Sequence, residues 1–496
     1  MVGAALSGDP QYLKRWAPYL LANPTPVEHD GKKYMTFIIA PYDGQSIFKM
    51  EDDGPFYAAL SAYAYWKLLG DDQYLATWYE TLESAISFLD ASSFKEEMGL
   101  YSERLINEAP LKDSPYWKDE KVLSLKIGDD WPMRVHSIYV NNLMYASHLM
   151  MAEFARHLGK TSEHERHLDR AEQLAAEIEK RLWNPKNHTY WTGIAIMEDG
   201  RQIPLDTSYH DIFFDYAWAF SLFPITPHTQ RSLQSVDAMV SPWLGDSPAD
   251  TSHAHVSIPF GHAACVYAWG GMFAKAKGCL QYVADLCQLV DYNPTMRAVY
   301  AMRGYMPEWN TLINCHRPQV FSSGPSLNAI VSLGASVDFN GVNLMPSGFL
   351  QTIDELSFKN AVLDIDLDSK SPVAGLVVDG VQVPYTLRIP SSMLTAGNHS
   401  VGFLERKAGD VFHPLLLHTN LELLSIGKLD SDNIEYLLKG FGNGVARFEQ
   451  LARDQVDLTD ESGKPVPFDF WSTTAGDSLR ISLRGQTVRL RVKPVN

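Results

Sequence analysis

The chain has 496 residues, of which 45% are hydrophobic and 20% are charged, and this length predicts two or more domains of ordinary globular composition. With 59 acidic against 42 basic residues the net charge is −17, which argues against nucleic-acid and anionic-membrane partners. No apolar run in the sequence reaches the roughly 20 residues that span a bilayer. The first residues lack the basic start and apolar core of a signal peptide, which favours a cytoplasmic over a secreted location.

Helical patterns occupy most of the chain up to about residue 340. Predicted helices cover residues 10–23, 55–69, 72–90, 133–158, 163–182, 207–223, 227–240, 258–275, 277–290 and 320–335. Segments 72–90 and 163–182 carry a single apolar stripe, whereas 133–158 is apolar around nearly its whole circumference. Buried helices followed closely by one-sided helices are what a two-layer ring of helical hairpins requires. Residues 1–340 are therefore predicted to form an (α/α)6 toroid that is almost wholly helical, although the pattern is one helical pair short of a complete ring.

The residue pattern of the sequence changes at about residue 341. From there on, alternating runs rich in β-branched residues are separated by Gly, Asp, Asn and Ser, as in GLVVDGVQVPYTLRI and SLRISLRGQTVRLRVKPV. This pattern predicts short strands and no helical layer within 360–490. We predict a C-terminal antiparallel β-sandwich domain over residues 341–496.

Three acidic sites lie in the connections that lead into the presumed buried helices. EDDGP at 51–55 and GDDWP at 128–132 precede two such helices, and MPEW at 306–309 lies in the long loop before a third. Asp53 and Asp130 each lie two residues before a proline, where aspartate commonly caps a helix. A cap does not need the second aspartate of each pair, Asp52 or Asp129. The doubled carboxylates therefore indicate a site in which neighbouring groups shift each other's pKa values.

Glycoside hydrolysis is the chemistry that needs such carboxyl groups at one cleft. One carboxylic acid protonates the leaving oxygen, while a carboxylate activates water or attacks the sugar itself. A carboxylate at a helix N-terminus is stabilised in its charged form, which suits a base or an acceptor of sugar hydroxyls better than a general acid. Asp53 is accordingly expected to bind sugar hydroxyls, and an acid at 129–130 needs burial or its acidic neighbour to stay protonated.

Two of these segments resemble the glucoamylase-type hydrolases. EDDGPFYAALSAYAYWKLLGD at 51–71 is similar to the segment in which an Asp-Gly-Pro opens an inner helix, which implies that Asp53 grips the terminal sugar. MPEW, followed by SGPSLNAIVSLGAS, resembles the Pro-Glu loop of that family, which implies that Glu308 is the general base of an inverting mechanism. The Trp-Glu-Glu motif that carries the family's acid is not found, and GDDWPMRVHSIYVNN occupies the corresponding stretch. Asp130 or Asp129 is therefore the substitute acid that the resemblance implies.

A second resemblance is to the α-L-rhamnosidases, which share the six-hairpin ring. It rests on GDDW and on the trailing β domain. Further side chains expected to hold the sugar, beside Asp52 and Asp53, are Trp131, Trp309, His210, Asp211 and Trp218. We predict that Asp53, Asp130 and Glu308 converge on one pocket at the mouth of the ring.

The resulting hypothesis is an inverting, exo-acting glycoside hydrolase that removes a terminal sugar, of α-glucoside or α-L-rhamnoside type, from an oligosaccharide or glycoconjugate. This chemistry requires no metal or organic cofactor, and the sequence leaves the oligomeric state open. Three alternatives remain: a polysaccharide lyase of toroid-plus-sandwich architecture, a phosphorylase, and a non-catalytic glycan-binding protein. A lyase needs basic residues in its cleft and a phosphorylase needs an anion site, whereas the presumed mouth is acidic.

Overall fold

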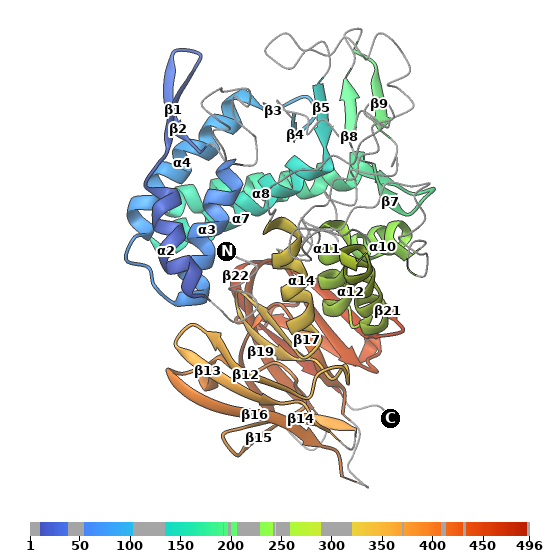
Figure 1. Ribbon diagram of the computed structural model, residues 1–496. Helices are drawn as coiled ribbons and strands as arrows, with labels where there is room; N and C mark the ends of the chain where they lie inside the picture. Colours follow the sequence, from blue (N-terminus) through green and yellow to red (C-terminus); the bar gives the residue numbers. More distant parts are fainter. Residues whose placement is uncertain are drawn as a thin grey trace.

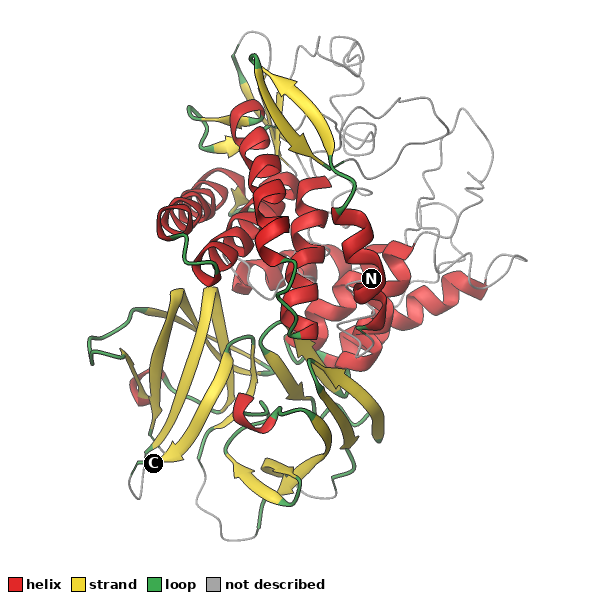
Figure 2. Cartoon of the chain, turned by 90° about the vertical axis from the view of Figure 1, so that its left-hand side faces the viewer, coloured by secondary structure: helices red, strands yellow, loops and turns green. Residues whose placement is uncertain are grey.

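The computed structural model describes residues 10–37, 54–102, 134–191, 193–196, 200–205, 229–241, 244, 258–288, 320–369, 372–407, 413–429 and 433–493. Helices gather in one half of the molecule and long strands in the other, as Figures 1 and 2 show. The predicted order, a helical domain followed by a β domain, is confirmed at this level. Among the described residues, no helix is both long and apolar enough to cross a membrane.

The helices agree closely with the sequence pattern in position and in burial. They are α2 (Gln11–Leu21), α3 (Gly54–Leu69), α4 (Leu75–Ser92), α7 (Ile138–His157), α8 (Thr161–Leu182), α10 (Thr229–Val240), α11 (Ile258–Trp269), α12 (Phe273–Gln288) and α14 (Val320–Ser332). Helices α3 and α7 are buried on nearly all sides, whereas α4 and α8 bury one face each. The predicted helix 207–223 lies outside the described residues.

Helices α3 and α7 lie side by side and run in the same direction. The rings of Tyr63 and Phe154 lie 5.7 Å apart, and those of Trp66 and His157 lie 4.9 Å apart. Lys67 also donates to Glu153 at 2.7 Å. Because these contacts join the C-terminal halves of both helices, the two N-termini lie at the same end of the helical layer.

Short hairpins interrupt the helical half, so the expectation of an almost wholly helical region up to residue 340 is wrong. The pairs are β1 (Thr25–His29) with β2 (Lys32–Thr36), β3 (Phe94–Lys95) with β4 (Leu100–Tyr101), β6 (Trp183–Asn184) with β7 (Thr189–Tyr190), and β10 (Ala335–Asp338) with β11 (Gly341–Leu344). A three-stranded sheet contains β5 (Arg134–Ser137), β8 (Gly193–Ile196) and β9 (Gln202–Leu205). The predicted helix 133–158 thus begins late, because Ser137 caps it by accepting a hydrogen bond from Val140 N at 3.1 Å.

The β domain contains two sheets. The first has the order β12 (Thr352–Phe358), β13 (Ala361–Asp366), β16 (Gly397–Glu405), β14 (Val373–Val378) and β15 (Val381–Pro384). The second joins β17 (Leu415–Thr419), β19 (Ile434–Glu449), β22 (Gly476–Val492) and β20 (Val456–Asp460), with β18 (Glu422–Lys428) on β19 and β21 (Phe468–Thr473) on β22. One pair, β13 with β16, is parallel, which corrects the expectation of a purely antiparallel domain. Only the short turns Ser391–Met393 and Arg453–Gln455 are helical among the described residues of this domain.

Polar contacts fasten the two halves to each other. Arg484 of β22 pairs with Asp169 of α8 at 2.7 Å, and Asn443 of β19 donates to the Tyr145 hydroxyl at 3.3 Å. Within the β half, Arg388 and Asp338 form a fully buried two-bond ion pair at 2.6 and 3.0 Å. Paired and hydrogen-bonded in this way, buried charges avoid the cost of isolated ones.

Candidate functional site

All of the sequence-predicted site residues lie outside the part of the chain that the structure describes. They are Asp52, Asp53, Asp129, Asp130, Trp131, His210, Asp211, Trp218, Glu308 and Trp309. Their roles and their convergence on one pocket therefore stay predictions.

The described residues next to these segments show what positions them along the chain. Helix α3 begins at Gly54, immediately after Asp53, and strand β5 begins at Arg134, shortly after the GDDWP segment. Strand β5 leads directly into α7, whose N-terminus lies at the same end of the layer as that of α3. The two acidic segments thus enter neighbouring, parallel, buried helices from one end of the helical half.

Asn141 of α7 links the residues that precede segment 103–133 to the residues that follow it. Its Oδ1 accepts from Tyr101 N at 2.8 Å, and its Nδ2 donates to Tyr101 O at 3.0 Å and to Ser137 O at 2.8 Å. The His136 ring lies within hydrogen-bond distance of the same Tyr101 carbonyl, with Nδ1 at 3.1 Å. Because Asn141 is completely buried, each of these bonds is shielded from water. The backbone at Tyr101 and the backbone at Ser137 are consequently held together.

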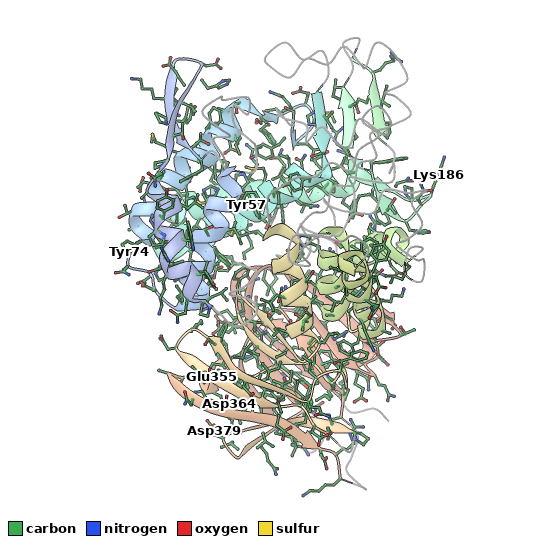
Figure 3. All side chains as sticks on the ribbon, in the orientation of Figure 1. Tyr57, Tyr74, Lys186, Glu355, Asp364 and Asp379 are labelled. Carbon is green, nitrogen blue, oxygen red and sulfur yellow. The ribbon has the colours of Figure 1, made fainter. Side chains whose placement is uncertain are left out.

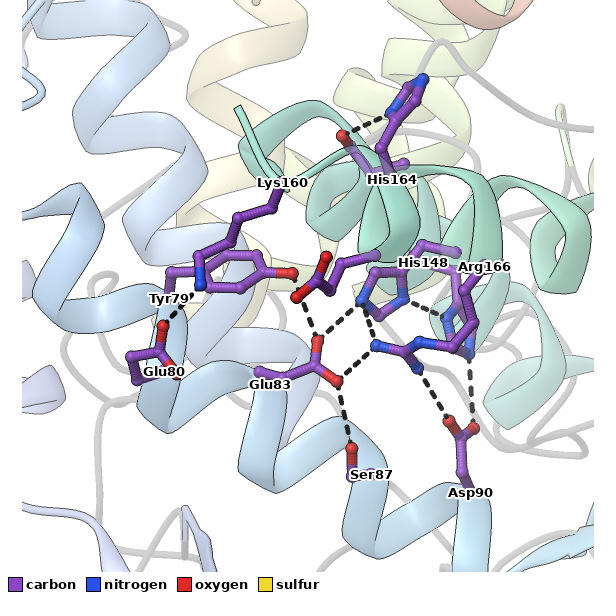
Figure 4. Close-up of polar contacts among 12 residues, drawn as sticks. Tyr79, Glu80, Glu83, Ser87, Asp90, His148, Lys160, His164 and Arg166 are labelled. Carbon is purple, nitrogen blue, oxygen red and sulfur yellow. Dashed lines mark hydrogen bonds and ion pairs between the residues drawn. The ribbon is translucent and has the colours of Figure 1, made fainter. Parts of the chain in front are cut away.

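Figure 4 shows a buried polar cluster between α4, α7 and α8, with Glu83, Asp90, His148 and Arg166 labelled. The side chain of Tyr101 belongs to the same cluster. Its hydroxyl donates to Asp90 Oδ1 and lies 2.8 Å from His148 Nε2. The Nδ1 atom of His148 lies 2.9 Å from His167 Nδ1, and His167 Nε2 lies 2.8 Å from Glu83 Oε2. Both imidazole rings are fully buried.

Charged neighbours keep both carboxylates of this cluster ionised. Burial acts to raise the pKa of Glu83, but hydrogen bonds and charges from His167 and Arg166 outweigh it and hold that pKa at about 2. Burial likewise acts to raise the pKa of Asp90, and His148 and Tyr101 outweigh it, so this pKa is also about 2. Burial lowers the pKa of His167 to about 4, although Glu83 opposes the shift.

The cluster has the properties of a structural anchor. Its carboxylates are charged at neutral pH, whereas a general acid must hold its proton there. The side chains of the cluster also form hydrogen bonds with one another. No group of His, Cys, Asp and Glu side chains suited to a metal ion occurs among the described residues. We infer that the cluster supports the backbone of Tyr101 and does not itself act on substrate.

Sequence reasoning missed this anchor, although a signal for it was present. Asn141 and His148 are seven residues apart in a helix that is otherwise apolar on almost every side. That spacing puts both polar side chains on one face of the helix. Two polar residues on one face of a fully buried helix indicate partners on the neighbouring elements, because unpaired polar groups are costly to bury.

Of the histidines in SHAHVSIPFGH, only His262 lies in the described part, where burial in α11 lowers its pKa well below the usual value. Cys265 and Cys279 are buried thiols that form no disulfide, and the sequence has no CxxC spacing.

Comparison with known proteins finds a similarity to one family of enzymes. Residues 3–201 match the model of the mannosylglycerate hydrolase MGH1-like glycoside hydrolase domain. No curated protein matches the sequence. The matched range contains the acidic segments before α3 and α7.

Solved structures with a similar chain trace share little sequence with this protein. A GH63 mannosylglycerate hydrolase from Thermus thermophilus has 12% identity and a TM-score of 0.40, with 67% of this chain and 90% of that chain covered. A GH78 rhamnosidase of Bacillus sp. GL1 has 14% identity and a TM-score of 0.44, with 64% and 32% covered. A GH92 α-mannosidase from Bacteroides thetaiotaomicron has 13% identity and a TM-score of 0.44, with 80% and 47% covered. The chain thus spans about a third of the rhamnosidase and about half of the mannosidase.

The match over residues 3–201 supports the expectation, drawn from the acidic motifs, of a glycoside hydrolase. Residues 3–201 of the chain are similar to the mannosylglycerate hydrolase MGH1-like glycoside hydrolase domain.

Proposed function

We propose that the protein hydrolyses small glycosides from the non-reducing end, with inversion at the anomeric carbon. The observation that carries this proposal is the family match over residues 3–201, which contains both Asp53 and Asp130. Asp130, or its neighbour Asp129, protonates the leaving oxygen, and Glu308 activates the attacking water. Asp52 and Asp53 hold the hydroxyls of the terminal sugar.

The substrate class follows from the family description. A mannosylglycerate hydrolase cleaves a sugar from a small carboxylated alcohol, so we propose a glycoside of that size as the substrate. We rank such a glycoside above the α-glucosides and α-L-rhamnosides that the sequence motifs suggested. The site lies at the end of the helical layer where α3 and α7 begin.

We further propose that the helical half is an (α/α)6 toroid backed by a β-sandwich. The alternation of fully buried α3 and α7 with one-sided α4 and α8 supports the ring, because an inner helix has neighbours on every side while an outer helix faces water. The two sheets of the C-terminal half support the sandwich.

The test is a panel of substrates assayed with the full chain. Mannosylglycerate and the nitrophenyl α-mannoside, α-glucoside and α-L-rhamnoside are compared for sugar release in buffer without phosphate. We expect mannosylglycerate to be cleaved with the highest kcat/KM. A product with an unsaturated ring would instead indicate a lyase, and turnover only with added phosphate would indicate a phosphorylase.

A matched pair of variants separates catalysis from folding. Glu308→Gln is expected to lower kcat by roughly 10²- to 10⁴-fold, because the amide keeps the shape of the base but cannot take a proton. Glu355→Gln is the control, since Glu355 is an exposed residue of β12 on the first sheet of the β half (Figure 3). Equal activity of the two variants would remove Glu308 from the mechanism.

A further inference from the structure

Strand β19 turns its two faces toward different halves of the molecule. Ala446 and Phe448 pack into the core of the second sheet. On the other face, Asn443 donates to the Tyr145 hydroxyl of α7 at 3.3 Å, and Arg447 reaches the turn between α11 and α12. In Figure 1 the α11–α12 pair lies next to β17 and β21 of the same sheet. Arg447 therefore lies at the seam between the helical half and the β half.

The guanidinium group of Arg447 is buried, and two of its nitrogens lack a partner. The residue is 5% exposed, and neither Nε nor Nη1 has a hydrogen-bond partner among the described residues. Burial lowers the pKa of Arg447 to about 10, so the side chain keeps its positive charge at neutral pH. A buried charge without a partner opposes folding strongly, because water no longer solvates it. This position therefore calls for a negative partner.

The buried groups on the neighbouring strands do not provide negative charge. His418 lies beside Arg447 on β17. Burial, together with the charges of Arg447 and Arg388, holds the pKa of His418 well below its usual value, so this ring is neutral. The carboxylate of Asp338 is already paired with Arg388, at 2.6 and 3.0 Å. Neither group balances the charge of Arg447.

The carboxylates that follow Arg447 on its own strand and adjoin it on β22 have other partners. Glu449 accepts from Arg406 at 2.8 Å. Asp477, next to the residue that pairs with Arg447 in the ladder, accepts from Leu451 N at 2.7 Å. Both carboxylates are thus engaged away from the guanidinium group.

Small residues surround the guanidinium group on both sides of the seam. A Cβ atom on Gly271 would overlap that group and would lie 3.0 Å from the Cβ of Ala475, in the turn between β21 and β22. The corresponding Cβ position at Gly476 is 3.4 Å from Arg447 Cγ. Because backbone comes so close from both halves, a single-atom ion fits here better than a large anion.

Helix α12 begins two residues after Gly271 and brings further donors. The Met272 carbonyl accepts from Ala276 N at 3.0 Å, so the N–H groups of residues 273–275 have no partner within the helix. The positive end of the helix dipole lies at the same place. Carbonyl groups in the last turn of α11 already accept from the N–H groups of residues 270–272. Positive groups thus meet at the seam, as they do in anion sites at helix N-termini.

We propose that Arg447 binds a small inorganic anion, of the size and charge of chloride, at the seam between the helical half and the β half. The guanidinium group supplies the charge, and the start of α12 adds a favourable field. Since Arg447 belongs to β19 and Gly271 to the helical half, the anion binds only when the two halves are docked. It therefore stabilises the folded chain by mass action. This anion takes no part in the proposed hydrolysis.

Urea unfolding of the full chain at pH 7 tests the anion site, with sodium chloride replacing sodium gluconate at constant ionic strength. The constant ionic strength separates binding of chloride from general screening. For one site on the folded chain, the unfolding constant falls by up to about tenfold for each tenfold rise in chloride above its dissociation constant. A wild-type unfolding constant that is the same in both salts would overturn the proposal.

A matched pair of variants locates the effect. Arg447→Met removes the charge and is expected to abolish the chloride dependence of unfolding. Arg491→Met is the control, because Arg491 lies in the same sheet but pairs with Glu435 at 2.9 Å and is 40% exposed. This variant is expected to keep the full chloride dependence. Equal chloride dependence in the two variants would contradict a site at Arg447.

Bromide locates the anion directly in the wild-type protein, which decides the matter if Arg447→Met does not fold. In a crystal of the full chain soaked in sodium bromide, we expect an anomalous peak between the Arg447 guanidinium group and the turn at Gly271. Bromide bound only at exposed surface positions would overturn the proposal. The urea titration is also repeated with sodium formate, which carries a carboxylate. Stabilisation by formate at lower concentrations than by chloride would contradict an inorganic ion as the occupant.

Discussion

Asn141 joins the backbone of Tyr101 to that of Ser137 in the described part of the chain. Its amide group makes three buried hydrogen bonds, two of them to the backbone of Tyr101. We predict that Asn141→Ala lowers the free energy of unfolding by about 2–4 kcal/mol, because it leaves buried backbone groups without partners. Urea unfolding with an unchanged m-value measures this.

The control for Asn141→Ala is a substitution of an exposed asparagine, whose hydrogen bond water can replace. Asn23 is exposed and donates to Tyr19 O at 2.7 Å. Asn23→Ala is expected to change the free energy of unfolding by about 0.5 kcal/mol or less. A similar loss in both variants would show that the Tyr101 backbone does not depend on Asn141.

At the scale of elements, Glu83 joins α4 to α8 through a charge that the fold stabilises. Its pKa of about 2 lies below the unfolded value of about 4.3, so this contribution is present above pH ~4.3 and is lost as the pH falls through about 2. We expect Glu83→Gln to be less stable than wild type at pH 7 and equal to it near pH ~2. Urea unfolding at a series of pH values measures the difference.

Glu80 provides the comparison on the same helix. It pairs with Lys160 at 2.8 Å, but its side chain is 67% exposed. Glu80→Gln is therefore expected to change the free energy of unfolding by about 0.5 kcal/mol or less at every pH. If both substitutions gave flat differences with pH, the charge of Glu83 would not be what joins the helices.

The turn between α11 and α12 makes a second connection between elements, here to β19. Gly271 has a φ of +75°, and a Cβ atom there would overlap the guanidinium group of Arg447. Gly159 has a φ of +72° with nothing near its Cβ position. We predict a loss of about 1–2 kcal/mol for Gly159→Ala, from backbone strain alone. A clearly larger loss is expected for Gly271→Ala in thermal or urea unfolding. Equal losses would mean that Arg447 moves aside freely.

At the scale of the whole molecule, the sequence predicted the helices and their burial because periodicity records which face is covered. The all-round apolar pattern of α7 and the single stripe of α8, from Leu168 to Leu182, both correspond to the observed burial. The β1–β2 hairpin was missed although Asp30-Gly31 marks its turn, with φ of 49° and 74° at the two residues. The parallel pairing of β13 with β16 could not be predicted, since it joins strands separated by β14 and β15.

For the candidate site too, the sequence predicted one part and the structure alone showed another. The motifs around Asp53 and Asp130 identified the class of chemistry, and the family match confirms that class. The anchor of Asn141, Tyr101 and His148 came only from the structure, because α4, α7, α8 and β4 have to meet before its partners become neighbours. Motifs report residues that touch substrate, whereas such supporting groups have no fixed spacing in the chain.

The central claim is inverting hydrolysis with Glu308 as the base, and the anomer first released tests it most directly. An inverting site holds its acid and base roughly 6.5–9.5 Å apart, with room for the attacking water between them. Proton NMR during cleavage of mannosylglycerate, started with concentrated wild-type protein, observes the sugar before it equilibrates. We predict that the first anomer has the configuration opposite to that of the substrate, and that Glu308→Gln releases almost none. A first product with the configuration of the substrate, or near-normal release by Glu308→Gln, would contradict the account.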